Sequence, residues 1–505
     1  MTALALNGLV AVPFAFAMVS LLVGRRRESA GVGLAALGGL VTLCWSIWLA
    51  AISTTALDGS KVDQVWLAAL DIRWHLGVDG ISLPLLLMST LIFALALLSL
   101  VRSAPDCGGT AWLAALLLVI EAGVIGSFLA LDLVLFFAFF EVALIPMWFV
   151  IDQWGDHHGP RAAEKRRRAA TRFLVFTVLG SALMLVGFLL VRAEAGTFDI
   201  VEIAASYEPT GPLALTAAVL VALGLAVKTP LWPVHIWLPD AHSTAPTVGS
   251  VVLAAVLLKL GTYGFLRFWL PVVDPGWSWL LPTVAALAVV GIVYAALACL
   301  AQTDLKRLIA YSSVGHMGFV VLAAATYTLG GVQAAVYASV AHGLITGLLF
   351  FLAGAVKDRY GTGDLRRLRG LYGRVPRLGG LVAVAAMASL GLPGLAGFWG
   401  EMLAIRASLF PADPLPRGTF VLLSVIAALG VILASAYFLA VLRSAFQTGE
   451  SGEAAPEPVT DGDVTGWEWL VWSPLLAAIV LFGVAPGLLL TPVAEAAVSF
   501  LGGAR

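Results

Sequence analysis

The chain contains few charged residues for its length. Of its 505 residues, 12% are Asp, Glu, Lys or Arg, whereas 60% are hydrophobic and the mean hydropathy is +0.98. Soluble domains carry about 25% charged residues and about 45–50% apolar ones. Because a soluble core could not bury so much apolar surface, the composition excludes an ordinary soluble protein. It predicts instead that lipid surrounds most of the chain.

Cysteine is also scarce, and the common nucleotide-binding motifs are missing. Cys44, Cys107 and Cys299 lie far apart and form no CxxC or other ligand spacing. A disulfide framework, a zinc site or an iron–sulfur cluster is therefore not expected. The sequence contains neither a Walker loop nor a dinucleotide GxGxxG fingerprint. We expect no cofactor and no metal on this chain, so the energy source of any transport reaction would lie on other proteins.

Long apolar runs, by contrast, are abundant. A helix needs about 20 apolar residues to cross the hydrocarbon layer, and the recurring runs predict an all-α membrane protein with about fourteen transmembrane helices. The expected spans are 3–23, 31–52, 78–101, 111–130, 132–151, 171–192, 212–232, 246–269, 277–301, 306–327, 331–356, 379–409, 418–445 and 467–495. The first is not expected to be a cleaved signal peptide, because Arg25, Arg26 and Arg27 follow its apolar run instead of preceding it.

The positive charges outside the spans set the orientation in the membrane, since cytoplasmic loops carry an excess of Lys and Arg. Placing Arg25, Arg26 and Arg27 in the cytoplasm puts about three times as many of the 29 Lys and Arg residues inside as outside. The sequence therefore predicts N- and C-termini on the outer, periplasmic side of a bacterial inner membrane. The basic loops Arg161–Arg172 and Lys357–Arg377 then lie inside, where they serve as topology signals and not as nucleic-acid-binding segments.

Two of the expected spans are interrupted by proline and glycine. The seventh contains KTPLWP from Lys228 to Pro233, and the twelfth contains GLPGLAGFWG from Gly391 to Gly400. Proline removes a helical hydrogen bond and glycine loosens the backbone, so both segments are expected to unwind. Unpaired backbone is costly in lipid and is tolerated where protein or trapped water satisfies it. These broken helices are therefore expected in the protein interior.

The interruptions lie about five spans apart, which predicts an internal repeat. A unit of five helices crosses the membrane an odd number of times, so its second copy must be inverted, as in inverted-repeat transporters. The chain then divides into N-terminal helices (1–110), a first repeat (111–270), a second, inverted repeat (277–446) and a C-terminal helix (467–505). The segment 447–466 is rich in Glu, Asp, Pro and Gly and is expected to be a mobile cytoplasmic loop.

Several ionisable residues stand inside the expected spans. A charge at the bilayer centre costs roughly 2.5–3.5 kcal/mol on insertion scales, and such residues commonly serve transport or proton transfer. A pair such as Glu141 and Lys228 could also join two helices as a static ion pair, with little net gain in stability. A series of acids, lysines and an imidazole in separate spans favours transport. The main candidates are Glu141, Lys228, Lys259, His316 and Glu401.

Other buried polar residues are weaker candidates. His342 and Glu121 are single polar residues in their spans, where such a side chain often only bonds a neighbouring helix. His235 follows the first interruption and stands near Asp240 and His242 in the segment PVHIWLPDAHS. This trio could suggest metal ligation, but no further His or Cys lies nearby in the sequence, so a metal site is not expected.

The types of these residues suit proton relay. Two unit charges 4 Å apart interact by about 4 kcal/mol at an effective dielectric of 20. If Glu141 approaches Lys228, the lysine holds its proton, and if Glu141 withdraws, the lysine can release it. Water at the unwound backbone would carry the proton onward. Lys259 and then His316 are expected to be the next carriers toward Glu401.

Four segments around these residues resemble the antiporter-like membrane subunits of respiratory complex I, the proton-pumping NADH–quinone oxidoreductase. They are EVALIPMWFVIDQWG, KTPLWPVHIWLPDAHSTAPTVGSVVLAAVLLK, DLKRLIAYSSVGHMGF and LPGLAGFWGE. The resemblance covers nearly the whole chain. It implies a fold with two inverted five-helix repeats and a proton pathway through Glu141, Lys228, Lys259 and Glu401, with His316 lining the same polar axis.

The resemblance also implies partners. NADH, FMN, iron–sulfur clusters and quinone would bind other subunits of the complex, and this chain would contact the neighbouring antiporter-like subunits and lipid. Glu401 matches the subunit M class, because the sibling subunits carry lysine at that position. The loop Asp156–Arg168 departs from the family pattern in being longer and more basic.

Other functions fit the same spans. The D-type subunit of a multisubunit sodium/proton antiporter and the membrane subunit of a membrane-bound hydrogenase share the ancestry and the acid–lysine pairing. The subunits that are isolated with the native chain would separate these from complex I. A stand-alone solute carrier would need a polar cluster for its substrate, and the sequence suggests none. A purely structural scaffold is disfavoured by the buried charges.

Overall fold

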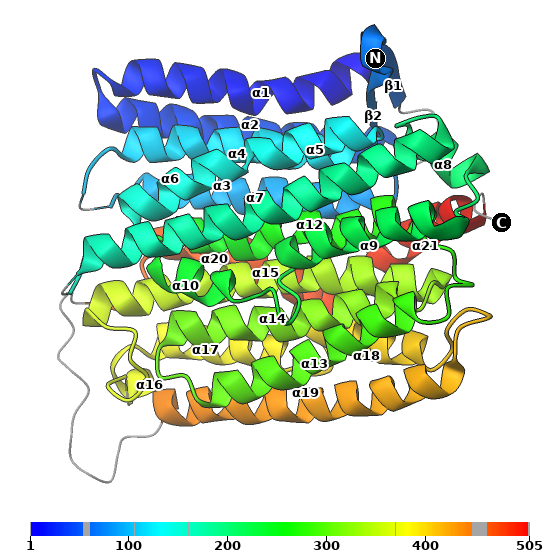
Figure 1. The fold of residues 1–505 in the computed structure, drawn as a ribbon. Coiled ribbons are helices and arrows are strands. Elements are labelled where there is room, and N and C mark those ends of the chain that lie inside the picture. The colour runs from blue at the N-terminus through cyan, green and yellow to red at the C-terminus, as the bar shows by residue number, and fades with distance from the viewer. Residues whose placement is uncertain are drawn as a thin grey trace.

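Helices dominate the structure, a computed structural model that describes residues 2–53, 61–105, 107–159, 161–368, 370–446 and 462–502. The long helices lie side by side with roughly parallel axes (Figure 1). In this part of the chain, 13 helical segments are long and apolar enough to cross a membrane. The predicted multi-pass helical membrane protein is confirmed.

Most of the crossing segments are single helices, and two are composite. The single helices are α1 (Thr2–Gly24), α2 (Glu28–Ser53), α3 (Ser82–Leu100), α4 (Thr110–Leu129), α7 (Ala162–Ala195), α9 (Gly211–Lys228), α13 (Leu280–Leu300), α14 (Leu305–Ala324), α15 (Leu329–Tyr360), α19 (Arg417–Phe446) and α20 (Gly466–Val484). The composite segments are α5 (Leu133–Val142) with α6 (Leu144–Trp154), and α11 (Thr247–Val252) continued by η3 (Leu253–Leu257), α12 (Leu258–Gly264), η4 (Phe265–Trp269) and η5 (Leu270–Val272). Here η3 and η4 are π-helical turns.

Both predicted interruptions are present. Helix α9 ends at Lys228, and the chain resumes as a helix only in α10 (Trp237–Thr244). The predicted twelfth span, 379–409, is split into α17 (Pro376–Ser389) and α18 (Ala396–Ser408). Gly391 and Gly394 in this second break have positive φ angles of 80° and 92°, which glycine adopts without steric cost. The split explains why 13 crossing segments are found in the described residues where about fourteen spans are predicted.

Two features of the fold were not predicted. Lys61–Leu67 (β1) and Ile72–Gly77 (β2) form an antiparallel hairpin, so the chain is not purely α-helical. Strands of six or seven residues are too short to form an apolar run of membrane-spanning length, so this sequence pattern does not indicate them. The last predicted span, 467–495, is wrong as a single helix, because α20 ends at Val484 and α21 (Gly487–Gly502) follows Pro486. Proline cannot supply the backbone N–H that would continue α20.

The hairpin is tied to the helical bundle by hydrogen bonds. The backbone N–H of Leu131 donates to the carbonyl of His75 at 2.9 Å, and the N–H of Ile200 donates to the carbonyl of Leu131 at 2.9 Å. The imidazole Nδ1 of His75 lies 2.7 Å from Oδ2 of Asp199, the residue that caps α8 (Ile200–Ser206). Asp132 caps α5 by accepting the N–H groups of residues 134 and 135. These contacts fix the start of the helix that carries Glu141.

The two ends of the bundle differ in their loops. The hairpin, α8 and both ends of the chain lie at one end of the bundle (Figure 1). The α1–α2 turn, the α6–α7 turn and α16 (Leu371–Arg374) lie at the other (Figure 1). The second end therefore holds Arg25, Arg26 and Arg27, and the arginines at the start of α7. This arrangement has the basic loops together at one end, as the charge pattern predicts.

The predicted acidic loop, 447–466, falls mostly outside the described residues. The end that is described is held in place by hydrogen bonds. The carboxylate of Asp463 accepts the backbone N–H groups of Arg377 and Leu378 at 2.7 and 3.0 Å. Thr465 then begins α20 with a capping box that it shares with Glu468.

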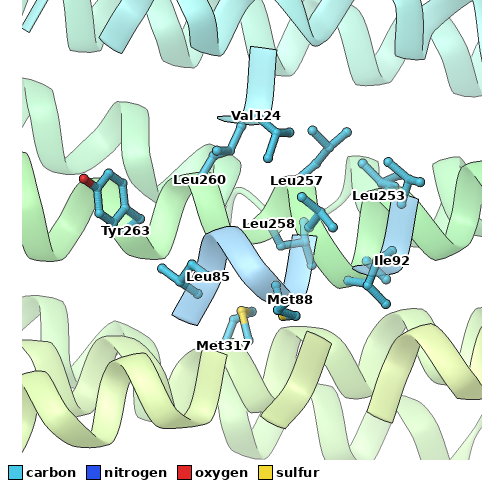
Figure 2. Packing of buried hydrophobic residues seen from close by; sticks show 14 of the residues in the cluster. Leu85, Met88, Ile92, Val124, Leu253, Leu257, Leu258, Leu260, Tyr263 and Met317 are labelled. Atoms are coloured by element: carbon cyan, nitrogen blue, oxygen red, sulfur yellow. The ribbon is translucent and has the colours of Figure 1, made fainter. Parts of the chain in front are cut away.

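The most deeply buried helices lie at the centre of the bundle. The apolar windows of Thr247–Val272 and of α15 are entirely buried, whereas those of α1 and α19 are about one-third buried. Leu85, Met88 and Ile92 of α3 and Val124 of α4 pack around the central segment Leu253–Tyr263 (Figure 2). The outer helices present their apolar side chains outward, as a lipid-exposed surface requires. The two central segments, Thr247–Val272 and α15, carry Lys259 and His342, respectively.

Candidate functional site

The first pair of predicted site residues, Glu141 and Lys228, comes from two neighbouring spans. Glu141 is the second-last residue of α5 and is half-buried, and Lys228 is the last residue of α9 and is buried. The ammonium Nζ of Lys228 lies 4.5 Å from the ring centroid of Phe140, a distance at which the ring face attracts a cation. Charge attraction by Lys228 and the hydroxyl of Ser181 act on the carboxylate of Glu141. Its Oε1 atom has no hydrogen-bond partner within the described chain.

The backbone around Lys228 is opened by the two prolines that follow it. The N–H of Thr229 still bonds the carbonyl of Leu225 at 2.8 Å, but the N–H of Leu231 bonds the carbonyl of Ala226, five residues earlier, at 2.9 Å. Pro230 and Pro233 supply no N–H of their own. The helix therefore stops directly after the lysine, and the ammonium group lies beside irregular backbone in the protein interior.

Lys259 lies in the most deeply buried segment and is fully enclosed. Its Nζ donates to the carbonyl of Ala254 at 2.6 Å and lies 2.6 Å from Nδ1 of His342 on α15. Ala254 belongs to the π-helical turn η3, and such turns displace carbonyl groups from the regular α-helical pattern. A lysine that is removed from lipid and water in this way needs acceptors, and the π turn and the imidazole supply them.

The line continues from His342 to the second broken helix. The ring centroids of His342 and His316 are 5.5 Å apart. Nδ1 of His316 lies 3.0 Å from Oε1 of Glu401, and its Nε2 lies 3.1 Å from Oγ of Ser389. His316 thus holds both ends of the break, because Ser389 is the last residue of α17 and Glu401 lies in α18.

A small cavity of about 20 Å³ lies where these groups meet, lined by both imidazoles, Ser389 and Glu401. A space of roughly 10–15 Å³ or more with several polar partners can hold a water molecule. Nε2 of His342 has no hydrogen-bond partner in the described part of the chain. A water molecule in the cavity would supply one and would lie beside Glu401, which also lines the cavity.

The proton positions follow from the hydrogen bonds. When Lys259 is charged, Nζ can only donate, so Nδ1 of His342 accepts and Nε2 of that ring carries the hydrogen. When Glu401 is ionised, it can only accept, so Nδ1–H of His316 donates to it. The hydroxyl of Ser389 then donates to Nε2 of His316, or accepts from it when the imidazole is charged. These tautomers are assigned from the bonding pattern.

The two groups of site residues meet at a close helix contact. A side chain at Gly261 would meet the hydroxyl and backbone of Thr229 and the backbone of Lys228. Glycine therefore lets α12, with Lys259 two residues earlier, pack directly on the break after Lys228. The hydroxyl of Thr229 is buried and has no partner among the described residues. It is the polar group at the contact between the two groups of site residues.

Three of the other candidates lie apart from this line. Glu121 on α4 is fully buried, and neither of its carboxylate oxygens has a partner in the residues described. His235 packs against Tyr294, with ring centroids 5.0 Å apart. His242 stacks on Phe350 at 4.7 Å. The structure therefore places them as buried polar groups outside the hydrogen-bonded line.

The possible metal ligands are engaged in contacts with other side chains. Asp240 pairs with Arg172 and Arg307, so it does not join His235 or His242 in a ligand set. A separate group at the hairpin, Asp63, His75 and Asp199, places one ligand atom of each residue within 4.8 Å of the others. Asp63, however, accepts two hydrogen bonds of 2.7 Å from the guanidinium of Arg73, and His75 bonds Asp199. An arginine at that position opposes a bound cation.

His342 is a weaker candidate than His316 from the sequence alone. In the structure its imidazole lies between Lys259 and His316. Depth in the membrane can be inferred from sequence, but the lateral contact between α12 and α15 cannot. Ser181, Thr229 and Ser389 were also missed, because small hydroxyl residues are common in membrane helices and give no signal of their own.

The chain is similar to membrane subunits of known respiratory complexes. Residues 130–436 match the family model described as NADH:quinone oxidoreductase/Mrp antiporter, TM. The NADH-quinone oxidoreductase subunit M of Rhodobacter capsulatus is 39% identical over 464 residues, which are 89% of this chain and 86% of that protein.

Solved structures agree with this family. A chain of respiratory complex I from Thermus thermophilus has a TM-score of 0.84 at 30% identity, covering 99% of this chain and 100% of that chain. A chain of the Mrp complex from Dietzia sp. has a TM-score of 0.83 at 26% identity, covering 98% of this chain and 52% of that chain. The range matched by the family model contains every residue of the buried line, from Glu141 to Glu401.

Proposed function

We propose a function from one premise, that the chain belongs to the NADH:quinone oxidoreductase/Mrp antiporter transmembrane family. The chain is the proton-translocating membrane subunit, of the subunit M class, of an NADH–quinone oxidoreductase. Its buried side chains and the water between them relay protons, and redox reactions on other subunits supply the energy. The observation that carries this proposal is the line of titratable side chains from Lys259 through His342 and His316 to Glu401.

The proton step along this line needs no large movement. A proton leaves Nζ of Lys259 and binds Nδ1 of His342 across the existing 2.6 Å contact. The proton on Nε2 of the same ring then leaves on its other side, so the imidazole ends neutral. A water molecule in the cavity passes that proton toward His316 and Glu401. The starting state returns when Lys259 takes up a new proton and the ring of His342 reverses its tautomer.

Glu141 and Lys228 form the controlling pair. The cation lies against an aromatic ring, and the acid acts on it through charge. At an effective dielectric of 20, a movement that takes a unit charge from 4 to 8 Å changes the interaction by about 2 kcal/mol, enough to shift a protonation equilibrium more than tenfold. A modest displacement of α5 at its break after Glu141 would therefore switch Lys228 between holding and releasing its proton.

The proposed function implies particular partner subunits and an orientation in the membrane. The NADH, FMN, iron–sulfur and quinone sites lie on other subunits, and the neighbouring antiporter-like subunits contact this chain. The chain lies in a bacterial inner membrane with its basic end in the cytoplasm, which puts the N- and C-termini on the periplasmic side. The two broken helices belong to the inverted repeats 111–270 and 277–446. The charge distribution and the spacing of the breaks support these assignments.

A second function is the D-type subunit of a multisubunit sodium/proton antiporter, or the membrane subunit of a membrane-bound hydrogenase. The similarity to the chain of the Mrp complex favours this alternative, because its TM-score nearly equals that of the complex I chain. The same acid–lysine pair would then exchange protons for sodium. The identity of 39% with a subunit M, against 26% with the Mrp chain, favours the oxidoreductase.

Purification of the native complex tests the choice. We expect the chain to co-purify with NADH-oxidising and quinone-reducing subunits, and proteoliposomes of that complex to acidify or alkalinise their lumen when NADH is oxidised. Co-purification with small hydrophobic subunits alone, together with sodium-driven proton exchange in the absence of NADH, would show that the oxidoreductase assignment is wrong.

A further inference from the structure

A cavity much larger than the one between the two imidazoles lies at the basic end of the bundle. It has a volume of about 820 Å³ and opens between the end of α6 and the start of α7. Arg166, Arg167, Arg168 and Arg172 line it. A topology signal requires positive charge on one side of the membrane, but it does not require a cavity.

Two of these arginines are engaged in bonds within the chain. Arg166 donates to the carbonyls of Asp152 and Asp156 at 3.0 and 3.3 Å, and Arg172 pairs with Asp240. They fix the start of α7 against α6 and α10. The other two, Arg167 and Arg168, are exposed and make no hydrogen bond or ion pair with the residues described. They are the guanidinium groups that are free to bind a ligand.

The cavity has an excess of positive charge. Its acidic residues are Asp152 and Glu164, which face four arginines. The Asp152 carboxylate accepts a hydrogen bond from the amide of Gln153 at 3.1 Å. Guanidinium groups bind phosphate oxygens with paired, charge-assisted hydrogen bonds. An anion with phosphate oxygens is therefore the ligand chemistry that these side chains fit.

An apolar surface continues from the cavity along α7. Val175 and Phe176 line the cavity, and the side chains of Val175 and Leu179 are 56% and 60% exposed. Residues 168, 172, 175 and 179 are spaced three or four apart and so share one helix face. At 1.5 Å per residue, Val175 and Leu179 lie about 10 and 16 Å further along the axis than Arg168. The arginines at the start of α7 are thus followed, along the same helix face, by the exposed apolar residues Val175 and Leu179.

We propose that this cavity binds the headgroup of an anionic phospholipid, with Arg167 and Arg168 holding the phosphate and an acyl chain lying along Val175 and Leu179. Basic pockets at the cytoplasmic ends of membrane helices are suited to such headgroups. A free phosphate or a soluble nucleotide would engage the arginines alone, whereas a phospholipid also contacts the apolar surface along α7. The site is independent of the proton line and of the choice between oxidoreductase and antiporter.

The experiment uses the intact membrane complex that contains this chain, purified in mild detergent and measured by lipid extraction and native mass spectrometry. The test variant is Arg167→Gln with Arg168→Gln. The matched control is Arg366→Gln with Arg367→Gln, which removes two exposed arginines from a loop of the same basic end. We expect the test variant to retain at least threefold less phosphatidylglycerol or cardiolipin at this chain than the control, and both to retain phosphatidylethanolamine equally.

A second variant separates a lipid from a small anion. Val175→Ser with Leu179→Ser leaves every arginine in place, and we expect this variant to bind less phosphatidylglycerol. In the unaltered complex, we expect inorganic phosphate at millimolar concentration not to displace phosphatidylglycerol. Equal retention of anionic lipid in the arginine variant and its control would overturn the proposal. So would full competition by inorganic phosphate, which would indicate a small-anion site. Loss of a neighbouring subunit from the arginine variant with unchanged lipid content would assign the surface to a protein partner and also overturn it.

Discussion

The two broken helices of this chain hold their ionisable residues in different ways. At the first break, Lys228 is held by the ring of Phe140 and by charge attraction from Glu141, whose Oε1 makes no bond in the described structure. At the second, Glu401 is bonded to His316, and His316 is bonded in turn to Ser389. Charge attraction varies smoothly with distance, whereas a hydrogen bond fails within a few tenths of an ångström. The interaction between Glu141 and Lys228 at the first break can therefore vary gradually with distance. The contact between Glu401 and His316 at the second break is either made or lost.

The removal of the charge at the first break should have the largest effect. Lys228→Met keeps the length and burial of the side chain but cannot carry a proton. We expect NADH-driven proton transport in proteoliposomes to fall about tenfold or more, because the controlling pair loses its cation. Lys228→Arg keeps the charge but does not release its proton. It should assemble normally and pump as poorly as the methionine variant, and full pumping by Lys228→Arg would show that proton release at this residue is not required.

The next largest effect is expected when the acid at each break is shortened, and the loss of pumping should differ between the two breaks. Glu401→Asp draws the carboxylate back by one methylene, which breaks the 3.0 Å contact with His316, and we expect pumping to fall about fivefold. Glu141→Asp weakens the charge interaction with Lys228 and alters the contact with Ser181, and we expect pumping to fall less than twofold. The measurement is the proton-to-NADH ratio of each reconstituted complex. Equal losses in the two variants would remove the distinction between the breaks.

The contact that joins the two groups of residues can be tested through stability. Gly261→Ala places a methyl group against the backbone of Thr229 and Lys228, and we expect it to destabilise the chain by about 1–3 kcal/mol, the usual cost of overpacking. Gly330→Ala is the matched control, because a methyl group there meets no atom within 4 Å. Thermal unfolding of the two variants in detergent should show a lower transition for Gly261→Ala only. An unchanged transition would mean that the helices separate easily at this point.

The smallest expected effect lies at the hairpin, away from both breaks. Burial raises the pKa of the Asp199 carboxyl, but the hydrogen bond and charge of His75 outweigh this, so the pKa lies below its usual 3.8. A carboxyl with a lowered pKa in the folded state contributes stability above its unfolded pKa and loses it as the pH falls through the folded value. Asp199→Asn should therefore speed hydrogen exchange in β2 about two- to fivefold at pH 7, and much less below pH 3.8.

Pumping provides the comparison for that variant. Because Asp199 lies outside both broken helices, the Asp199→Asn complex should transport protons at the rate of the unaltered complex. An equal exchange rate for the two proteins at pH 7 would contradict the stabilising role of the His75–Asp199 pair. A loss of pumping would extend the functional site to the hairpin.

Sequence alone locates the breaks and most of the ionisable residues. The reason is the cost of unpaired backbone and of charge in lipid, which makes Pro230, Gly391, Lys228 and Lys259 conspicuous in an apolar chain. The hairpin is hidden, because a strand of seven residues does not register in a search for membrane spans. The end of α20 at Val484 is hidden as well, since apolar residues continue on both sides of Pro486.

The connections between the residues could not be predicted in the same way. Lys259 and His342 are 83 residues apart in sequence, and nothing in the composition of α12 or α15 indicates that they touch. Such lateral contacts depend on the rotation of each helix about its axis, which small residues such as Gly261 and Gly343 permit through close packing. The sequence therefore does not reveal that His342 lies between Lys259 and His316.

Replacement of His342 tests the central claim most directly. Glutamine keeps an acceptor for Lys259 but cannot pass a proton from one ring nitrogen to the other. The control is His242→Gln, at an imidazole that is equally buried and stacks on Phe350 without a hydrogen bond in the described structure. In the reconstituted complex, the proton-to-NADH ratio should fall severalfold for His342→Gln and stay at the unaltered value for His242→Gln. A normal ratio for His342→Gln would contradict the proposal that protons pass along this line.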